Sequence, residues 1–168
     1  WYAYEWANLV LACSVCARYK SSQFPTQHER VAPFTPLALA DQERPVLIDP
    51  SNDQPFEHLA FTVEGICLGK NDRGKETIDV LKLNRSELVG RRAAIFSEWV
   101  VFFEKLRGKD YALILSEIEN RLDDRRAHVG AVRIWISDSL LATSERSTPP
   151  REAEFFSELA GFISLGTD

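Results

Sequence analysis

The chain has 168 residues, of which 45% are hydrophobic and 11% aromatic, enough for a packed core in one domain or two small ones. Its formal net charge of −5 excludes a protein that coats nucleic acid through bulk positive charge, because neutralising phosphates requires clustered lysine and arginine. A small cationic site stays compatible with this charge.

The sequence has no membrane-spanning or secretory pattern. No apolar run approaches the ~20 residues that cross a bilayer, and the first residues lack a charged segment followed by an apolar one. We therefore expect a cytoplasmic protein without membrane contact. The chain contains no methionine, not even at position 1, which leads to the hypothesis that a further N-terminal segment precedes Trp1.

The first residues alternate large rings with small or acidic side chains. Such alternation predicts an edge strand or extended segment that packs one face on a core. Stacking of the rings on nucleic-acid bases is the alternative. The rings belong to Trp1, Tyr2, Tyr4 and Trp6.

A Cys-x-x-Cys pair follows at Cys13 and Cys16 and should form a knuckle that runs into a short helix over residues 18–22. Two thiolates at this spacing can hold one side of a tetrahedral structural zinc ion. A closed site needs four ligands, so further ones must come from histidine, carboxylate or another segment. A redox dithiol or two buried thiols are the alternatives, but no thioredoxin-like pattern surrounds the pair. Cysteines of this kind fit a reducing compartment better than a disulfide framework.

Cations gather just after the cysteines. Arg18, Lys20 and Arg30 outnumber the single acid Glu29, so this part of an acidic chain is locally basic. Ordinary solvated surface is one reading of these cations. Contact with phosphates of nucleic acid is the other, and it is favoured beside a metal-nuclease motif.

The middle of the chain predicts a loop, a strand and a hairpin. Residues 21–44 contain three prolines and little periodicity, so we expect a loop, followed by a short strand over Val46–Ile48. Residues 61–68 should form a β-hairpin that turns near Glu64–Gly65, with Cys67 as a small buried thiol. The intervening segment carries side chains that could converge on an ion or a phosphate, although an imidazole beside acids is more often a structural hydrogen-bonding group. These are Asp49, Asp53 and His58.

From Arg73 onward the pattern becomes helical. Arg73–Leu83 predicts one helix, with Ile78, Leu81 and Thr77 facing inward. Asn84 with Glu87 has the spacing of a capping box and predicts the start of a long helix that ends at Gly108. Its expected buried stripe consists of Val89, Ala93, Phe96, Val100 and Phe103, widened by Trp99 and Leu106.

Three further segments complete the chain. A second amphipathic helix is predicted over residues 111–122, and Val132–Ile136 fits either a helical turn or a buried strand. Pro150 suits the first position of a last helix. The composition shift near residue 85 predicts an α+β module over residues 1–84 and a mainly α-helical extension over residues 85–168.

Three separated segments together resemble the HNH nuclease family found with retron and Septu-type bacterial defence systems, and the first of them resembles the second half of the HNH motif. These are WYAYEWANLVLACSVCARYKSSQFP, PVLIDPSNDQPFEHLAF at residues 45–61 and RGKETIDVLKLNRSEL at residues 73–88. The resemblance covers roughly residues 1 to 92. It implies a small ββα-metal fold with a zinc knuckle, and an upstream segment with a second Cys-x-x-Cys and a catalytic histidine. Neither upstream feature is present in these residues.

The resemblance also implies a mechanism in which a divalent ion such as Mg²⁺ assists cleavage of DNA phosphodiester bonds. Asn8 would position the general base, where a turn or helix cap is its alternative role. His58 is a further catalytic candidate, since it falls in the family's D-x-P-x-E-H-L pattern. Cys13 and Cys16 would hold structural zinc. Arg18 and Lys20 would contact DNA phosphates.

Position 17 departs from the family pattern, because Ala17 stands where histidine or asparagine usually helps to hold the catalytic ion. A methyl group cannot coordinate a cation. We therefore expect no cleavage by these residues alone. The alternative function is a catalytically inactive zinc-binding scaffold, and a Cys-x-x-Cys oxidoreductase is a more remote one.

The family is similar to the nuclease half of a pair with an ATPase. The resemblance thus implies DNA as substrate, a defence-system ATPase as partner, and a homo- or hetero-oligomer. Apolar residues of the helical extension could dock such a partner or simply form a core.

Overall fold

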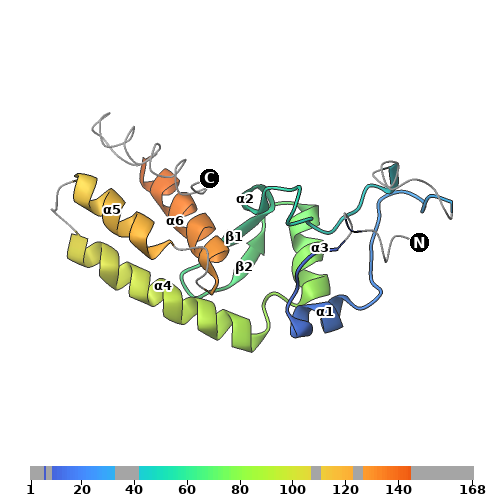
Figure 1. Ribbon diagram of the computed structural model, residues 1–168, viewed down its shortest axis with the longest axis horizontal. Helices are drawn as coiled ribbons and strands as arrows, with labels where there is room; N and C mark the ends of the chain where they lie inside the picture. The colour runs from blue at the N-terminus through green and yellow to red at the C-terminus, as the bar shows by residue number, and fades with distance from the viewer. Residues whose placement is uncertain (1–5, 7–8, 33–41, 107–110, 123–126, 145–168) are drawn as a thin grey trace. The chain divides into compact units, whose positions relative to one another are not determined.

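The computed structural model describes residues 6, 9–32, 42–106, 111–122 and 127–144 (Figure 1). The expected last helix from Pro150 and most of the expected first strand lie outside these residues. Trp6 is described and its side chain is 86% exposed, so packing of this ring on a core is wrong. The described elements are α1 Ser14–Lys20, α2 Pro55–His58, β1 Leu59–Phe61, β2 Cys67–Gly69, α3 Asp72–Leu81, α4 Ser86–Leu106, α5 Tyr111–Arg121 and α6 Val129–Ser144.

The chain divides into two compact units. Unit 1 comprises Trp1–Leu59 and Leu68–Asn84, and unit 2 comprises Ala60–Cys67 and Arg85–Asp168. In unit 1, α1 contacts α3, and in unit 2, α4 contacts α6. Among the described helices, none combines the length and the apolar character that a membrane crossing requires.

The predicted hairpin is confirmed. Strands β1 and β2 pair in a two-stranded sheet, and the Thr62 amide donates to the Ile66 carbonyl at 2.9 Å. Gly65 has φ +82°, a backbone conformation that side chains other than glycine rarely adopt. A Cβ at this position would also overlap the Val89 carbonyl oxygen, so glycine lets the turn approach α4 closely within unit 2.

The core of unit 2 is an aromatic cluster between helices. Phe96 is fully buried and stacks on Trp135, with ring centres 4.8 Å apart, while Trp99 meets Phe102 edge to face at 5.3 Å. Such rings bury much apolar area and prefer these offset or edge geometries. Residues of all three described long helices build the cluster, which consists of Phe96, Trp99, Phe102, Ile118, Leu122, Val132 and Ile136.

The buried face of α4 differs from the predicted stripe. Phe96 and Trp99 are buried as expected, but Val100 is 36% exposed and the buried positions include Arg92 and Phe102. The buried face of α4 is therefore rotated about the helix axis relative to the predicted face. In residues 132–136, where helix and strand were both open, the structure has the helix α6.

In unit 1 the expected strand at Val46–Ile48 is wrong. These residues belong to no strand. An isolated bridge pairs the preceding Pro45 with Thr26, and the Val46 amide donates to the Pro25 carbonyl at 3.0 Å. Other backbone groups of the segment bond to side chains of α3, and the Ile48 amide donates to Thr77 Oγ1 at 3.0 Å. Thr77 is 3% exposed, as the predicted inward face requires.

Candidate functional site

The Cys-x-x-Cys pair lies at the beginning of α1. Cys13 is the N-cap, with Sγ accepting a hydrogen bond from the Cys16 amide at 3.3 Å, so the helix starts at the motif and not after it as predicted. Cys13 is exposed and Cys16 half-buried. Both cysteines thus stand in one turn at the surface, an arrangement in which two sulfurs can address one ion.

The two predicted phosphate-binding cations lie on the same helix. Arg18 is exposed, whereas Lys20 is half-buried and donates from Nζ to the Gln23 carbonyl at 3.2 Å. Its Nζ also lies 5.8 Å from the centre of the Phe24 ring. Ala17 is exposed in the middle of this helix. Asn8, the predicted positioning residue, lies outside the described residues.

His58 is buried, with a side chain held by Asn71. The Asn71 Nδ2 lies 2.9 Å from His58 Nδ1 and donates to the Glu57 carbonyl at 3.2 Å, while its Oδ1 accepts the Gly74 amide at 3.0 Å as the N-cap of α3. The Asn71 Oδ1 lies 3.2 Å from the same ring nitrogen, so the amide group of Asn71 faces His58 Nδ1 with both of its polar atoms. This geometry favours a structural role for His58.

Asp49 and Asp53 are used within the protein. The Asp53 carboxylate forms a two-point pair with Arg73, at 2.9 Å and 2.5 Å, and also accepts the Asp49 amide at 2.7 Å. These bonds, led by that of Arg73, hold the pKa of Asp53 below its ordinary value. Asp49 accepts from Ser51 and Asn52 in the same turn. The two carboxylates therefore order a loop.

Arg73 ties that loop to α3. Besides pairing with Asp53, its guanidinium donates to the Val46 carbonyl at 3.3 Å and the Leu47 carbonyl at 3.0 Å. Sequence reasoning missed both this role and the cap at Asn71. The signal for Asn71 was present, since Asn directly before a helical period is a preferred N-cap.

The third cysteine, Cys67, belongs to unit 2. Cys67 is 1% exposed, and burial raises its pKa to about 11, so the predicted buried thiol is confirmed. Within the described part of the chain, no group of three or more His, Cys, Asp or Glu side chains could hold a metal ion. The described residues thus offer at most two sulfur ligands for zinc at this motif.

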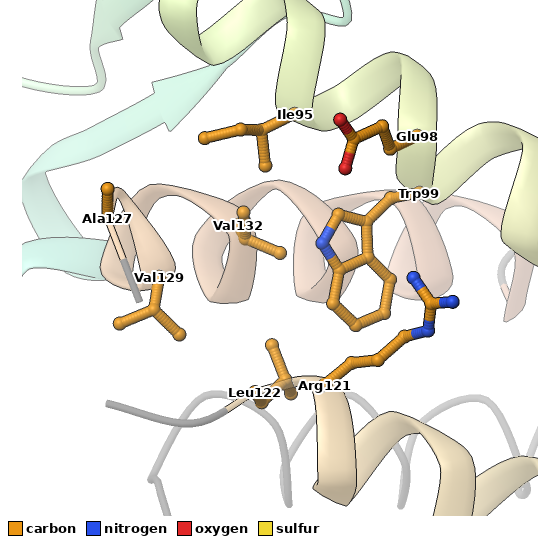
Figure 2. Close-up of a pocket in the computed structure, with 8 residues that line it drawn as sticks. All are labelled: Ile95, Glu98, Trp99, Arg121, Leu122, Ala127, Val129 and Val132. Atoms are coloured by element: carbon orange, nitrogen blue, oxygen red, sulfur yellow. The ribbon is translucent and has the colours of Figure 1, made fainter. Parts of the chain in front are cut away.

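A separate pocket of about 190 Å³ lies in unit 2 between α4, α5 and α6 (Figure 2). Its lining is mostly apolar, with Glu98 and Arg121 as the charged members. The Arg121 guanidinium carbon lies 4.2 Å from the Phe102 ring centre, a cation–π contact. No predicted site residue lines this pocket. The remaining lining residues are Ile95, Trp99, Leu122, Ala127, Val129 and Val132.

Comparison with known proteins finds two relatives from Bacillus mycoides (strain KBAB4). The Septu protein PtuA is 34% identical over 99 residues, which are 59% of this chain and 14% of PtuA. The Septu protein PtuB is 35% identical over 98 residues, which are 56% of this chain and 33% of PtuB. Part of this chain is homologous to Septu proteins.

The expected Septu association is thereby confirmed, and the nuclease assignment stays a prediction. The matched regions make up a third or less of the length of these Septu relatives. No protein-family model matches the chain. No solved structure matches it either.

Proposed function

We propose that this chain is a component of a Septu-type antiphage defence system and that unit 1 belongs to an HNH-type endonuclease acting on DNA. The observation that carries the first part is the homology to both PtuA and PtuB. The second part rests on the family resemblance of the Cys-x-x-Cys segment and on the surface position of that motif.

Regions of nearly equal size match the two Septu relatives, although these regions are 14% of one protein and 33% of the other. Each match covers more than half of this chain, so the two matched regions overlap, and a region shared by proteins of different length is what a module would give. In our proposal, this module works beside other parts of a Septu protein or complex. Its partner would be a second Septu protein, such as an ATPase, in a hetero-oligomer.

The Cys-x-x-Cys motif supplies only two of the four ligands that a structural zinc ion needs. Cys13 and Cys16 supply thiolates from one helical turn, and the Cys16 amide already donates to the Cys13 sulfur at 3.3 Å. Amide donation of this kind suits a charged sulfur, because hydrogen bonds to an ionised acceptor are the stronger ones. The remaining ligands must come from outside the described residues. When bound, structural zinc would fix the start of α1 and do no chemistry.

The proposed DNA contacts lie on the same short helix. Arg18 is exposed and can reach a phosphate without rearrangement. Lys20 is held by the Gln23 carbonyl and the Phe24 ring, so it supplies charge at a fixed position. Asn8 would position the general base, which the proposal places outside the described residues. His58 would hold the start of α3 through Asn71.

The zinc part of the proposal is tested by measuring metal content. The natural full-length protein, purified without added metal, should contain one zinc per chain by elemental analysis. Cys13→Ser with Cys16→Ser should remove it, and Cys67→Ala, which deletes the buried third thiol, should keep it. Equal zinc in both variants would contradict ligation by the Cys-x-x-Cys pair.

The defence part is tested in cells. A host that expresses the complete natural defence genes should resist phage, measured as efficiency of plating, and the double cysteine variant should lose that resistance. Retained resistance in a variant that is expressed and has lost its zinc would contradict a role for this motif in defence.

A second candidate function is an inactive zinc-binding scaffold, and the exposed Ala17 favours it. Plasmid nicking with Mg²⁺ separates the two functions. We expect no nicking by the 168 residues alone. In the full-length protein, Ala17→Asn or Ala17→His should produce or increase metal-dependent nicking if the module is an enzyme. No nicking by either variant would support the scaffold.

A further inference from the structure

The pocket between α4, α5 and α6 is held in shape by the core of unit 2 (Figure 2). Three of its lining residues, Trp99, Leu122 and Val132, belong to the buried aromatic cluster and are at most 6% exposed. Close-packed core side chains keep one arrangement, so the space of about 190 Å³ beside them is a pre-formed feature of the fold. All of its described lining residues belong to unit 2.

Trp99 brings a hydrogen-bond donor to this pocket. Its ring is fixed by Phe102 and Phe103, with ring centres 5.3 Å and 5.8 Å away. Figure 2 shows the indole nitrogen on the side of the ring that faces Ile95 and Val132. Among the described residues, no group accepts a hydrogen bond from this N–H. An indole N–H in a buried position usually has an acceptor, so a bound molecule can supply one that the lining does not.

Water is a poor occupant of this pocket. A buried water molecule needs about two to four polar partners, and the aliphatic side chains of the lining offer none. Glu98 is exposed, so its carboxylate is hydrated from the solvent side, and the Arg121 guanidinium is held 4.2 Å from the Phe102 ring centre. A mostly apolar pocket that holds water weakly is suited to an apolar molecule. The aliphatic members of the lining are Ile95, Leu122, Ala127, Val129 and Val132.

We propose that this pocket binds a small, uncharged aromatic molecule with one hydrogen-bond acceptor. The ring of the molecule lies against the aliphatic lining, and its acceptor takes the hydrogen bond from the Trp99 N–H, which can only donate. The molecule is uncharged, because an ionised group would lose its hydration among aliphatic side chains. Its size is that of one substituted benzene ring, since a cavity of about 150 Å³ with a similar lining accommodates benzene. This site does not depend on the proposed function.

Acetophenone is the probe that tests the proposal, because it joins a benzene ring to a single carbonyl acceptor. Isopropylbenzene is the matched ligand, with nearly the same shape and no acceptor. Binding to the full-length protein with isotope-labelled tryptophan is followed by nuclear magnetic resonance, and the Trp99 indole signal is the one missing from Trp99→Phe. Acetophenone should shift this signal in a saturable way. It should also bind about two- to tenfold more tightly than isopropylbenzene, the ratio that one net hydrogen bond gives.

Two variants locate the site. Ala127→Leu enlarges an exposed residue of the lining, so saturable binding of acetophenone should be lost. Its matched control is Ala94→Leu, the same change at an exposed position of α4 outside the described lining, which should leave binding unchanged. Trp99→Phe keeps an aromatic ring and removes the N–H. In this variant the two probes should bind with equal affinity, measured by titration calorimetry.

Equal affinities of the two probes for the wild-type protein would overturn the hydrogen bond to Trp99. Acetophenone binding that Ala127→Leu leaves unchanged, or no saturable binding to the folded wild type, would overturn the pocket as a ligand site. Circular dichroism shows whether each variant is folded. Because Ala127 is exposed, Ala127→Leu keeps the test decisive even if Trp99→Phe, which changes a core residue, does not fold.

Discussion

Thr77 shows how one hydroxyl group can hold a chain segment in place. It is 3% exposed, and its Oγ1 accepts the Ile48 amide at 3.0 Å. Thr77→Val keeps the shape but leaves that amide without an acceptor, which costs about 1–3 kcal/mol. We expect this loss in the free energy of unfolding from urea titration. Thr77→Ser retains the hydroxyl and should lose clearly less. A smaller loss in Thr77→Val than in Thr77→Ser would show that the methyl group, and not the hydrogen bond, matters.

Asp53 makes the stability of the protein depend on pH in the acid range. Its pairing with Arg73 lowers its pKa from 3.8, so the folded state favours the carboxylate. The contribution to stability is therefore complete above the unfolded value and is lost as pH falls through the lowered pKa. Asp53→Asn should be less stable than wild type at neutral pH, and the difference should shrink below about pH 4. A constant difference across that range would contradict the pairing.

For single residues, the sequence predicted the features that depend on the pattern of neighbouring residues. The buried Cys67 follows from its alternation with apolar neighbours, and the hairpin turn near Gly65 follows from the strand pattern around it. The bonds of Arg73 and Thr77 to the 46–53 segment were not predictable, because they join residues twenty or more positions apart. Which polar side chain meets which backbone group is decided by packing. Asp53 does lie beside Asp49 and interacts electrostatically with His58, but Arg73 and Asn71 engage the Asp53 and His58 side chains, and these described residues form no group that could hold a metal ion.

At the scale of elements, two glycines in helices have opposite roles. A Cβ at Gly74 would overlap the His58 carbonyl oxygen and come within 3.1 Å of the Gly69 Cα, so Gly74 allows the first turn of α3 to cross close to β2. Gly74→Ala must displace backbone and should be destabilising. At Gly90 in α4, an added Cβ meets no heavy atom of the described residues within 4 Å, so Gly90→Ala should instead stabilise by about 0.5–1 kcal/mol, because alanine is the better helix former.

Thermal unfolding of the two alanine variants checks this contrast. The midpoint should fall for Gly74→Ala and rise slightly for Gly90→Ala. A rise for both would mean that the approach of α3 to His58 is not required for folding. A fall for both would mean that Gly90 has a packing role that its open surroundings do not show.

Helices were predicted better than the faces they bury. The α4 helix begins at Ser86, close to the predicted cap at Asn84, yet its buried side includes Arg92 and leaves Val100 partly exposed. The hairpin turn at Gly65 contacts α4 next to Arg92, and its carbonyl takes the arginine Nε. This tertiary contact turns the arginine side of the helix inward. No periodicity in the sequence could indicate it.

The segment Val132–Ile136 was ambiguous for a related reason. Val132, Ile134 and Ile136 are all buried although the segment is a helix, and this alternation is also what a strand would give. A helix that is apolar on most of its sides is buried on most of its sides. Trp135, which lies between these buried positions in the sequence, also packs, because its ring stacks on Phe96.

At the scale of the whole molecule, the two units are unequally packed. Of the buried hydrophobic residues that the structure describes, only Leu47, Leu59 and Val80 belong to unit 1. The aromatic cluster lies entirely in unit 2. Unit 1 instead relies on polar contacts such as those of Arg73 and Asn71. A small unit with little buried apolar area commonly needs a metal or a partner for stability, which agrees with the proposed zinc at α1.

Because the chain divides into two units, we expect a destabilising substitution in the core of unit 2 to affect unit 2 much more than unit 1. Phe96 is fully buried, and Phe96→Ala should cost about 3–5 kcal/mol through lost contacts and a cavity. In hydrogen exchange followed by mass spectrometry, amides of α4 and α6 should lose protection, while those of α3 should change much less, because opening can occur in separate cooperative units. Leu113→Ala, at a 58% exposed position of α5, is the control and should leave both patterns unchanged. If α3 loses protection as strongly as α4 does in Phe96→Ala, the two units unfold as one, and the stability of unit 1 must come from the aromatic cluster.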